Sequence, residues 1–241
     1  TVMEHTTTTA LLLEPDRDAG SLALSETAWG RRVGAGGEAR ELAERASELG
    51  KRLKAAGKDI AQAVGLLWDD QSVMARFEET GPLPPEVATE LGIVGVAARA
   101  SGLARDVRYN QPSGIFRFFH IPVSTCDSGD VFARAYVRWL EIQQSLTFIG
   151  EQLRALAPAQ SSPRIGSLAP ESLAVALNEG WRGEICHAAI TDAQGAFSRY
   201  KVVDPSFHNW PALAYVLRGQ EISDFPLCNK SFNLSYCGHD L

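Results

Sequence analysis

Two long stretches of the chain repeat their apolar residues at the spacing of an α-helix. In residues 38–67 the apolar positions recur at steps of three, four and seven residues, at Leu42, Leu49, Leu53, Ile60, Val64 and Leu67. Residues 129–156 continue the pattern at Val131, Ala135, Trp139, Ile142, Leu146, Ile149 and Leu153. A long helix with one apolar stripe must pack that stripe against another surface. The sequence therefore predicts two long helices packed in one body.

The apolar period changes from helical to alternating in the last third of the chain. Residues 184–191 and 196–203 alternate around the turn Asp192–Gly195, which predicts a β-hairpin. Before the hairpin, residues 170–180 are expected to form a short helix that Gly180 ends. After it, another short helix is expected, with Asn209 as its N-cap and Pro211 in its first turn.

These elements divide the chain into three parts. Residues 1–37 form a poorly defined N-terminal segment, which we expect to be the end of a truncated region, since the chain begins with Thr1 rather than Met. Residues 38–156 are the helical body. Residues 157–241 are a C-terminal section with the hairpin, short helices and a buried tail. The predicted fold class is mainly α with a small β-hairpin section (α+β).

Composition and charge exclude several classes of protein. The net charge of −6, without a basic block, argues against a nucleic-acid partner. The apolar run at 92–98 is too short to be a transmembrane segment, and no signal peptide precedes the helical body. The four cysteines include no CxxC pair, so neither a disulfide framework nor a zinc ribbon is expected. A reducing cytoplasm fits this cysteine usage best.

Several motifs occur in an order that resembles one superfamily. They are GVAARASGLARDVR (95–108), GDVFARAYVRWLEIQQS (129–145), GWRGEICHAAITD (180–192), VVDPSFHNWPAL (202–213) and DFPLCNKSFNLSYCGHDL (224–241). Together they are similar to the large subunits of membrane-bound nickel–iron hydrogenases of the formate hydrogenlyase type and to the 49-kilodalton, D-type component of respiratory complex I. The resemblance is strong from about residue 90. Before it, VGAGGEARELAE resembles the family's Pro-Gly-Gly-Val loop, with Ala35 in place of the proline.

This resemblance implies both a fold and a setting. The fold would be a helical bundle of the hydrogenase large-subunit type. The chain would be one subunit of a membrane-associated NADH-quinone oxidoreductase-like or hydrogenase-like complex, lying in the cytoplasm on the inner face of the membrane. Its partners would be an iron–sulfur small subunit and membrane-arm subunits. The chain itself would bind no cofactor, the iron–sulfur cluster would belong to the partner, and quinone is a candidate ligand of the complex.

The C-terminal motif departs from the hydrogenase pattern at the metal ligands. The family's nickel-binding ending is Asp-Pro-Cys-x-x-Cys, and the resemblance places Ser235 and Gly238 at the two cysteine positions, with Cys237 between them. A serine hydroxyl is a poor ligand for a soft metal, and glycine has no side chain. The family's other cysteine pair would lie upstream of Thr1. We therefore expect no nickel, and Cys228, Cys237 and His239 show no zinc spacing.

No residue stands out as catalytic, but two sets of candidates do emerge. By resemblance, the residues expected to line a redox cavity are Arg99, Asp106, Arg108, Ser235, Tyr236 and Asp240. For the three from the RASG…D-R motif, a structural ion-pair network is an equally good explanation. Arg134, Arg138 and Glu141 share one helix face, and an ion-paired ladder is expected there. Ser235 lacks a neighbouring base in the sequence and is not expected to be a nucleophile. His120 and His187 have no evident partners in the sequence and are expected to be ordinary polar residues.

Two functions remain open at this point. The first is a nickel-free, complex I-like or hydrogenase-like subunit that contributes to electron transfer. The second is a non-catalytic scaffold, or a degenerate fragment, that only binds partner subunits. The ending of the chain argues against an active nickel–iron hydrogenase. In either case the tail should run back into the core beside the RASG loop, with Phe232, Leu234 and Tyr236 filling the metal's space.

Overall fold

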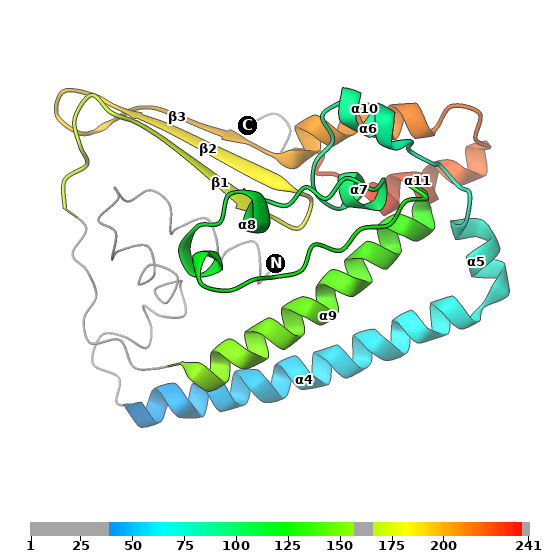
Figure 1. The fold of residues 1–241 in the computed structure, drawn as a ribbon, viewed down its shortest axis with the longest axis horizontal. Helices are drawn as coiled ribbons and strands as arrows, with labels where there is room; N and C mark the ends of the chain where they lie inside the picture. Colours follow the sequence, from blue (N-terminus) through cyan, green and yellow to red (C-terminus); the bar gives the residue numbers. More distant parts are fainter. Residues whose placement is uncertain (1–38, 157–165, 238–241) are drawn as a thin grey trace.

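The computed structural model describes residues 39–156 and 166–237. Two long helices lie along one edge, and a small sheet and several short helices lie on the opposite side (Figure 1). The helices are α4 (Ala39–Asp69), α5 (Gln71–Phe77), α6 (Pro85–Glu90), α7 (Gly95–Ala100), α8 (Val107–Asn110), η2 (Gly114–Arg117), α9 (Val131–Ala155), α10 (Pro205–Val216), η3 (Ile222–Asp224) and α11 (Phe225–Phe232). The strands are β1 (Leu173–Glu179), β2 (Glu184–Thr191) and β3 (Phe197–Val203). The predicted fold class, mainly helical with a small antiparallel sheet, is confirmed.

The long helices α4 and α9 confirm the prediction from periodicity. They run antiparallel, side by side (Figure 1). At one end, Trp68 of α4 packs against the rings of Phe132, Tyr136 and Trp139, at centroid distances of 6.3, 5.7 and 6.2 Å. The N-cap of α9 is Asp130, whose Oδ1 accepts a hydrogen bond from the Ala133 amide at 2.8 Å. In the described residues, no helix is long and apolar enough to cross a bilayer.

The sheet contains the predicted hairpin, β2–β3, and one strand that was not predicted. Residues 170–180 do not form a helix, so that prediction was wrong. Instead Leu173–Glu179 is β1, which pairs antiparallel with β2 from Leu173↔Ile190 to Glu179↔Glu184. Leu and Ala favour a helix locally, but pairing with β2 supplies partners for the backbone groups that face it, and tertiary context overrides propensity. Gly180 therefore ends a strand, exchanging backbone hydrogen bonds with Gly183.

Helix α10 begins five residues earlier than predicted. Its N-cap is Asp204, whose side chain accepts from the Ser206 amide at 2.7 Å, and Pro205 occupies the first turn. Asn209 is therefore not the cap but a buried residue inside the helix. Its side-chain Oδ1 accepts from the Val94 amide at 3.0 Å, and its Nδ2 donates to the Val94 carbonyl at 3.1 Å. This paired contact ties α10 to the start of α7.

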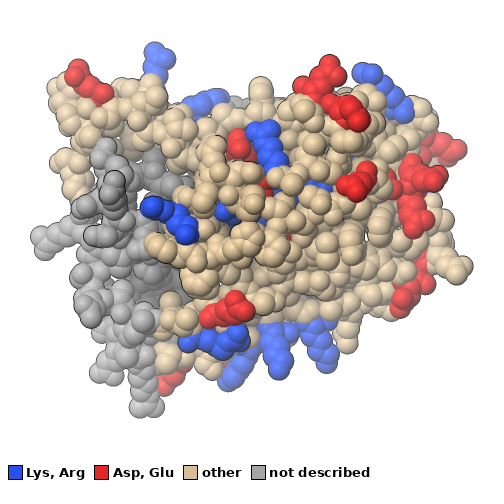
Figure 2. Space-filling view, in the orientation of Figure 1, with Lys and Arg blue, Asp and Glu red and all other residues tan. Residues whose placement is uncertain are grey.

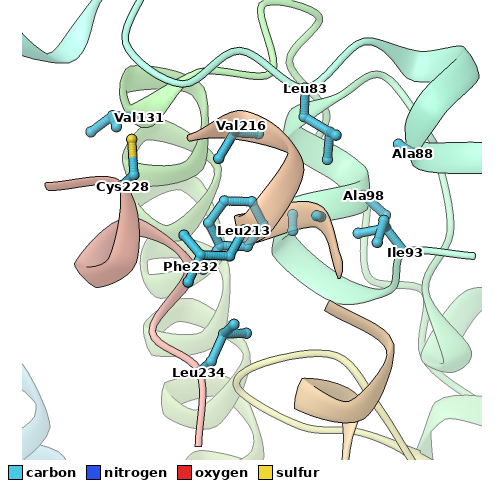
Figure 3. Packing of buried hydrophobic residues seen from close by; sticks show 12 residues of the cluster. Leu83, Ala88, Ile93, Ala98, Val131, Leu213, Val216, Cys228, Phe232 and Leu234 are labelled. Carbon is cyan, nitrogen blue, oxygen red and sulfur yellow. The ribbon is translucent and has the colours of Figure 1, made fainter. Parts of the chain in front are cut away.

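The hydrophobic core joins α7, α9, α10 and α11. Figure 3 shows side chains from these four helices and from the segment before α6 pointing toward one another. Its buried members include Leu83, Ile93, Ala98, Val131, Leu213, Val216, Cys228, Phe232 and Leu234. Segments approach closely here: a Cβ added at Gly95, where φ is +67°, would lie 2.3 Å from the Arg182 carbonyl oxygen. Only glycine fits such a position, and the close approach brings the loop after β1 against α7.

Candidate functional site

A buried group of charges surrounds Arg99 of α7. The Arg99 Nε donates to Glu141 Oε1 of α9 at 2.7 Å, and its Nη1 donates to Glu179 Oε1 of β1 at 2.8 Å. The same Nη1 donates to the Arg105 carbonyl at 2.8 Å and lies 3.5 Å from Asp106 Oδ2. The Arg99 side chain is 1% exposed. One guanidinium therefore holds together a short helix, a long helix, a strand and the loop after α7.

Asp106 and Arg108 complete this group. Asp106 is the N-cap of α8 and accepts from the Arg108 amide at 2.9 Å. The Arg108 side chain forms a bidentate ion pair with the same carboxylate. Its Nε donates to Asp106 Oδ1 at 3.0 Å, and its Nη2 donates to Asp106 Oδ2 at 2.6 Å. We call Arg99, Asp106, Arg108, Glu141 and Glu179 the Arg99 cluster. Its members come from four elements, and all but Glu179 were candidates in the sequence.

In the Arg99 cluster, burial of a charged group and its pairing with an opposite charge shift its pKa in opposite directions. Burial would raise the pKa of the Asp106 carboxyl, but the hydrogen bonds and charge of Arg108, with the charge of Arg99, lower it below its ordinary value. For Glu179 burial dominates and raises the pKa, although Arg99 opposes the shift. Burial would lower the pKa of Arg99, yet the charges of Glu179, Glu141 and Asp106 raise it above its ordinary value.

The Arg99 cluster is densely hydrogen-bonded, but one of its buried polar atoms has no partner in the described part of the chain. Both Glu179 oxygens accept hydrogen bonds, Oε1 from Arg99 and Oε2 from the Val107 amide at 3.1 Å. With all members ionised, the three carboxylates outnumber the two guanidiniums. The buried Nη2 of Arg99 has no hydrogen-bond partner among the described residues. Such a network fixes charges in a site of low dielectric constant, where each charge acts strongly on its surroundings.

Two further arginines of α9, the buried Arg134 and the partly buried Arg138, contact α11. Arg134 donates to Ser231 Oγ at 2.8 Å and to the Gly81 carbonyl at 3.1 Å, and its guanidinium lies 4.4 Å from the Phe232 ring centre. Arg138 donates to the Ser231 and Phe232 carbonyls at 2.5 and 3.1 Å. Burial lowers the pKa of Arg134 to about 9 and that of Arg138 to about 10.

These contacts differ from the ladder expected along α9. In the part of the chain that the structure describes, Glu141 pairs with Arg99, and neither Arg134 nor Arg138 makes an ion pair with it. The two arginines instead donate to main-chain carbonyls, including those at the C-terminal end of α11. Carbonyls in the last turn of a helix lack intrahelical partners and carry partial negative charge, so cations are stabilised there.

The tail after α11 was only partly predicted. Phe232 and Leu234 are 2% and 6% exposed and belong to the same core cluster as Ala97 and Ala98, beside the RASG motif. The expectation that Tyr236 is buried was wrong, since its side chain is 68% exposed. Its hydroxyl accepts from Asn229 Nδ2 at 2.8 Å, and its ring packs edge-on against Trp210. Because Asn233 adopts a left-handed conformation, φ +56°, the chain turns before Tyr236.

Ser235 lies in this turn, apart from the Arg99 cluster in its contacts. Its amide donates to Ser206 Oγ at 2.9 Å, and its hydroxyl lies 3.8 Å from the exposed Cys237 Sγ. Gly238, His239 and Asp240, which entered the sequence-based expectations, lie outside the described residues. Across residues 39–156 and 166–237, no three His, Cys, Asp or Glu side chains are grouped so as to hold a metal ion.

The histidines also differ from expectation in having partners. His187 Nδ1 lies 2.7 Å from the Tyr200 hydroxyl across the hairpin, and His120 packs edge-on against Tyr109. Sequence reasoning missed Glu179, because the expected helix over 170–180 gave that residue no path to Arg99. In the structure Ala176 and Asn178 are buried between less buried neighbours, as in a strand, but the sequence LAVALNE does not alternate between apolar and polar residues and so gave no signal for one.

Comparisons with known proteins identify the family to which this chain belongs. The profile of the family described as "Respiratory-chain NADH dehydrogenase, 49 Kd subunit" matches residues 7–166. An NADH-quinone oxidoreductase subunit (D 2) of Herpetosiphon aurantiacus is 34% identical over 168 residues, which cover 66% of this chain and 45% of that protein. The carbon monoxide-induced hydrogenase of Rhodospirillum rubrum is 30% identical over 172 residues, covering 71% and 48%.

Formate hydrogenlyase subunit 5 of Escherichia coli is 29% identical over 179 residues, covering 74% of this chain and 32% of that protein. This chain thus spans about half, or less, of the length of the relatives it matches. A chain of the membrane-bound sulfane sulfur reductase, an archaeal respiratory membrane complex, superposes with a TM-score of 0.70. The match covers 84% of this chain and 55% of that one at 24% identity, which shows a shared fold. The chain belongs to the family of the 49 kDa subunit of respiratory-chain NADH dehydrogenase.

Proposed function

We propose that this chain is part of the large subunit of a nickel-free, membrane-associated redox complex. In this function it contributes to electron transfer between an iron–sulfur partner subunit and an acceptor such as quinone, rather than to hydrogen activation. Its partners are that iron–sulfur small subunit and the membrane-arm subunits. Its place is the cytoplasmic side of the membrane. Within the family, it would stand nearest to hydrogenase large subunits that have lost the nickel ligands.

The observation that carries this proposal is the chemistry of the C-terminal turn. A nickel–iron site of the hydrogenase kind needs soft thiolates at two positions, which the resemblance aligns with Ser235 and Gly238. Ser235 offers a neutral hydroxyl, and its amide is held by Ser206. Cys237 offers one thiol, exposed and one residue away from the second ligand position. These groups do not fit the metal pair, so no step of the proposed function passes through nickel.

The Arg99 cluster is the feature that suits this chain to electron transfer. Its ion pairs fix several charges in a buried network between α7, α9 and β1. Fixed charges need little reorganisation when a neighbouring centre gains or loses an electron, and they act strongly where water is excluded. In this role Arg99 and Arg108 stabilise negative charge on a reduced centre in the partner subunit. Glu141, Glu179 and Asp106 hold the two guanidiniums in position.

Metal content and hydrogen chemistry test the proposal. The complex that contains this chain should be purified from its host and analysed for nickel, and then assayed for hydrogen-dependent dye reduction and for quinone reduction. We expect nickel far below one atom per chain, no hydrogen-dependent activity, and quinone reduction by the intact complex. About one nickel per chain, or hydrogen oxidation that follows the chain through purification, would overturn the proposal.

A non-catalytic scaffold that only binds partner subunits is the second candidate, because exposed aromatic side chains such as Phe118, 72% exposed, are typical of surfaces that contact other proteins. The variant Glu141→Gln separates the two functions, since it keeps an acceptor for Arg99 while removing one charge of the cluster. Electron transfer in the assembled complex should slow with Glu141→Gln and stay unchanged with Glu86→Gln, an exposed acid in the first turn of α6. Equal rates in a complex that assembles normally would favour the scaffold.

A further inference from the structure

Two glutamates lie directly opposite each other where β1 meets β2. Glu179 is the last residue of β1 and Glu184 is the first of β2, and the two are paired in register. Between them, Gly180 and Gly183 exchange backbone hydrogen bonds at 2.8 and 3.2 Å. The next pair along an antiparallel ladder is then a non-hydrogen-bonded pair, in which opposite Cβ atoms are about 4.5–5.5 Å apart. Two carboxyl groups therefore lie side by side on one face of the sheet, and we call them the Glu179–Glu184 pair.

The two members of this pair differ in their access to water. The side chain of Glu179 is 4% exposed and that of Glu184 is 22% exposed. Glu184 Oε2 lies 3.9 Å from Nη2 of Arg105, whose side chain is 53% exposed. Figure 2 shows basic and acidic side chains close together on the face that carries α8 in Figure 1. Glu184 thus lies near the surface, with Glu179 buried beside it.

The charge of Glu179 is only partly compensated. Its Oε1 accepts from Arg99 Nη1, but the same nitrogen donates to the Arg105 carbonyl and lies 3.5 Å from Asp106 Oδ2. Each Nη of a guanidinium carries two N–H groups, so three acceptors share two hydrogens. The charged side chains around the pair come from every element packed against it: Arg99 of α7, Arg105 and Asp106 of the following loop, Arg108 of α8 and Glu141 of α9.

Asp106 is better compensated than Glu179. Arg108 binds both oxygens of Asp106 and lowers the pKa of that carboxyl. Burial raises the pKa of Glu179, and the nearby charge of Asp106 adds to the rise, although Arg99 opposes it. A proton on Glu179 would also leave Arg99 in place, since Glu141 and the Arg105 carbonyl remain as its acceptors. Of these buried carboxyl groups, Glu179 is therefore the best suited to bind a proton.

A polar pocket connects this pair with the surface. It has a volume of about 390 Å³, and we call it the α8 pocket. The amide of Val107, which lines the pocket, donates to Glu179 Oε2 at 3.1 Å, so the pocket and the buried carboxyl contact the same residue. A hollow of this size with polar walls has room for water. Its lining consists of Ala104, Arg105, Val107, Asn110, Gln111 and Glu184.

We propose that the Glu179–Glu184 pair is a proton-binding site that takes up its proton from water in the α8 pocket. A hydronium ion in the pocket transfers a proton to the Glu184 carboxylate and becomes water. The proton then passes to an oxygen of Glu179, so that one O–H bond forms as another breaks and no electron moves. Held between the two carboxyl groups, the proton removes their mutual repulsion, as in other pairs of carboxylates that share a site.

The use of this proton would be to balance an electron on a neighbouring centre, and that use rests on the proposed function. Proton binding itself does not rest on it. The experiments below therefore contain neither an electron donor nor an acceptor. A failure of electron transfer would leave their results unchanged, and the absence of a bound proton would leave the nickel, hydrogen and quinone assays unchanged.

Infrared spectroscopy of the purified complex that contains this chain detects the proton. A protonated carboxyl group has a C=O stretching band that shifts in D₂O and disappears when the group ionises. We expect such a band to persist at pH values above the ordinary pKa of a glutamate, because burial raises the pKa of Glu179. The band should be lost in Glu179→Gln, which keeps an acceptor for Arg99, and retained in Glu86→Gln, an exposed acid of α6. No such band, or one that persists in Glu179→Gln, would overturn the proposal.

The variant Glu184→Gln distinguishes a shared proton from one that Glu179 holds alone. It removes the negative neighbour at a partly exposed position and keeps the shape of the side chain, so the complex should still assemble. Without that neighbour the proton should be bound less tightly, and the infrared band should disappear at a lower pH than in the unmodified complex. A titration that Glu184→Gln leaves unchanged would contradict the shared site.

The rate of hydrogen–deuterium exchange tests the route through the pocket. After rapid mixing with D₂O, the time course of the band shift gives the rate at which the proton exchanges. Gln111→Trp narrows the α8 pocket at an exposed lining residue and should slow this exchange about tenfold or more. Gln62→Trp, at an exposed position of α4 outside the lining, is the control and should exchange at the unmodified rate. Equal rates in both variants would show that the proton does not pass through the α8 pocket.

Discussion

At the scale of single residues, the structure is dominated by arginines held inside the protein. Arg99 contacts carboxylates from α9, β1 and the loop before α8. Arg134 and Arg138, by contrast, are held mainly by carbonyl groups. The two environments have opposite effects on pKa: carboxylates raise that of Arg99, whereas burial lowers those of Arg134 and Arg138. Removing an arginine from either environment leaves buried acceptors without a donor.

We predict that Arg99→Met strongly destabilises the chain. The substitution leaves the carboxylates of Glu179 and Asp106 buried without their shared cation, and breaking a buried ion pair in this way costs about 3–5 kcal/mol. Unfolding by urea, followed by far-ultraviolet circular dichroism, measures the free energy of unfolding. Arg76→Met is the matched control, because Arg76 forms an exposed pair with Asp224 at 3.4 Å; such pairs contribute about 0–1 kcal/mol. Similar losses in both variants would contradict a special role for the cluster.

At the scale of elements, α11 and the turn after it link the core to the C-terminal motif. Arg138 donates to the Ser231 and Phe232 carbonyls at the end of α11, and Arg182 donates to the Asn233 carbonyl. Phe232 and Leu234 then enter the core, and Ser235 bonds to the start of α10. Cys228, Ser231, Phe232 and Leu234 are thus buried, while Phe225 and Tyr236 lie on the surface.

We predict that truncation after Lys230 lowers the stability of the chain by several kcal/mol. The truncation removes Phe232 and Leu234, and burying each large apolar side chain contributes about 1.5–3 kcal/mol, against a typical total stability of about 5–15 kcal/mol. The measurement is the midpoint of thermal unfolding.

The variant Tyr236→Ala is the control for this truncation, because it removes an exposed side chain of the tail and leaves Phe232 and Leu234 in place. Because most of the Tyr236 side chain is exposed, this variant should change the midpoint little. An unchanged midpoint after truncation would show that the tail contributes no packing. A loss with Tyr236→Ala as large as that from truncation would contradict the surface position of the ring.

At the scale of the whole molecule, apolar surface remains exposed in more than one place. The segment 116–123 carries Phe118 and Phe119 with exposed side chains, and Phe118 is 72% exposed. Phe116 and Phe119 also pack against Phe148 of α9, at centroid distances of 6.0 and 5.7 Å. Contiguous exposed aromatic surface of this kind marks sites of contact with other proteins.

We predict that the isolated chain binds hydrophobic dyes and self-associates through this segment. Phe118→Glu should lower dye fluorescence and shift the chain toward monomer in size-exclusion chromatography with light scattering. The control is Ile222→Glu, which changes an apolar residue that is 95% exposed at η3, away from this segment. If the unmodified chain stays monodisperse at high concentration and binds no dye, the segment is not a contact surface.

The sequence by itself determined the elements whose signal is local. The period of apolar residues along 38–67 and 129–156 predicted α4 and α9, and alternation around Asp192–Gly195 predicted the β2–β3 hairpin. The order of the motifs indicated the family, which the match over residues 7–166 confirms. These signals can be read from the sequence alone, because helix period, strand alternation and turn residues depend on residues that are close along the chain.

Tertiary structure alone decided which distant residues meet. Residues 173–179 became a strand because β2 was available to pair with them, and only that pairing brought Glu179 to Arg99, eighty positions away in the chain. The side chain of Asn209 bonds to the Val94 backbone instead of capping its helix. Tyr236 points outward because the chain turns at Asn233, which has a left-handed conformation. In each case the free energy comes from a partner far along the chain, and no local pattern encodes the identity of that partner.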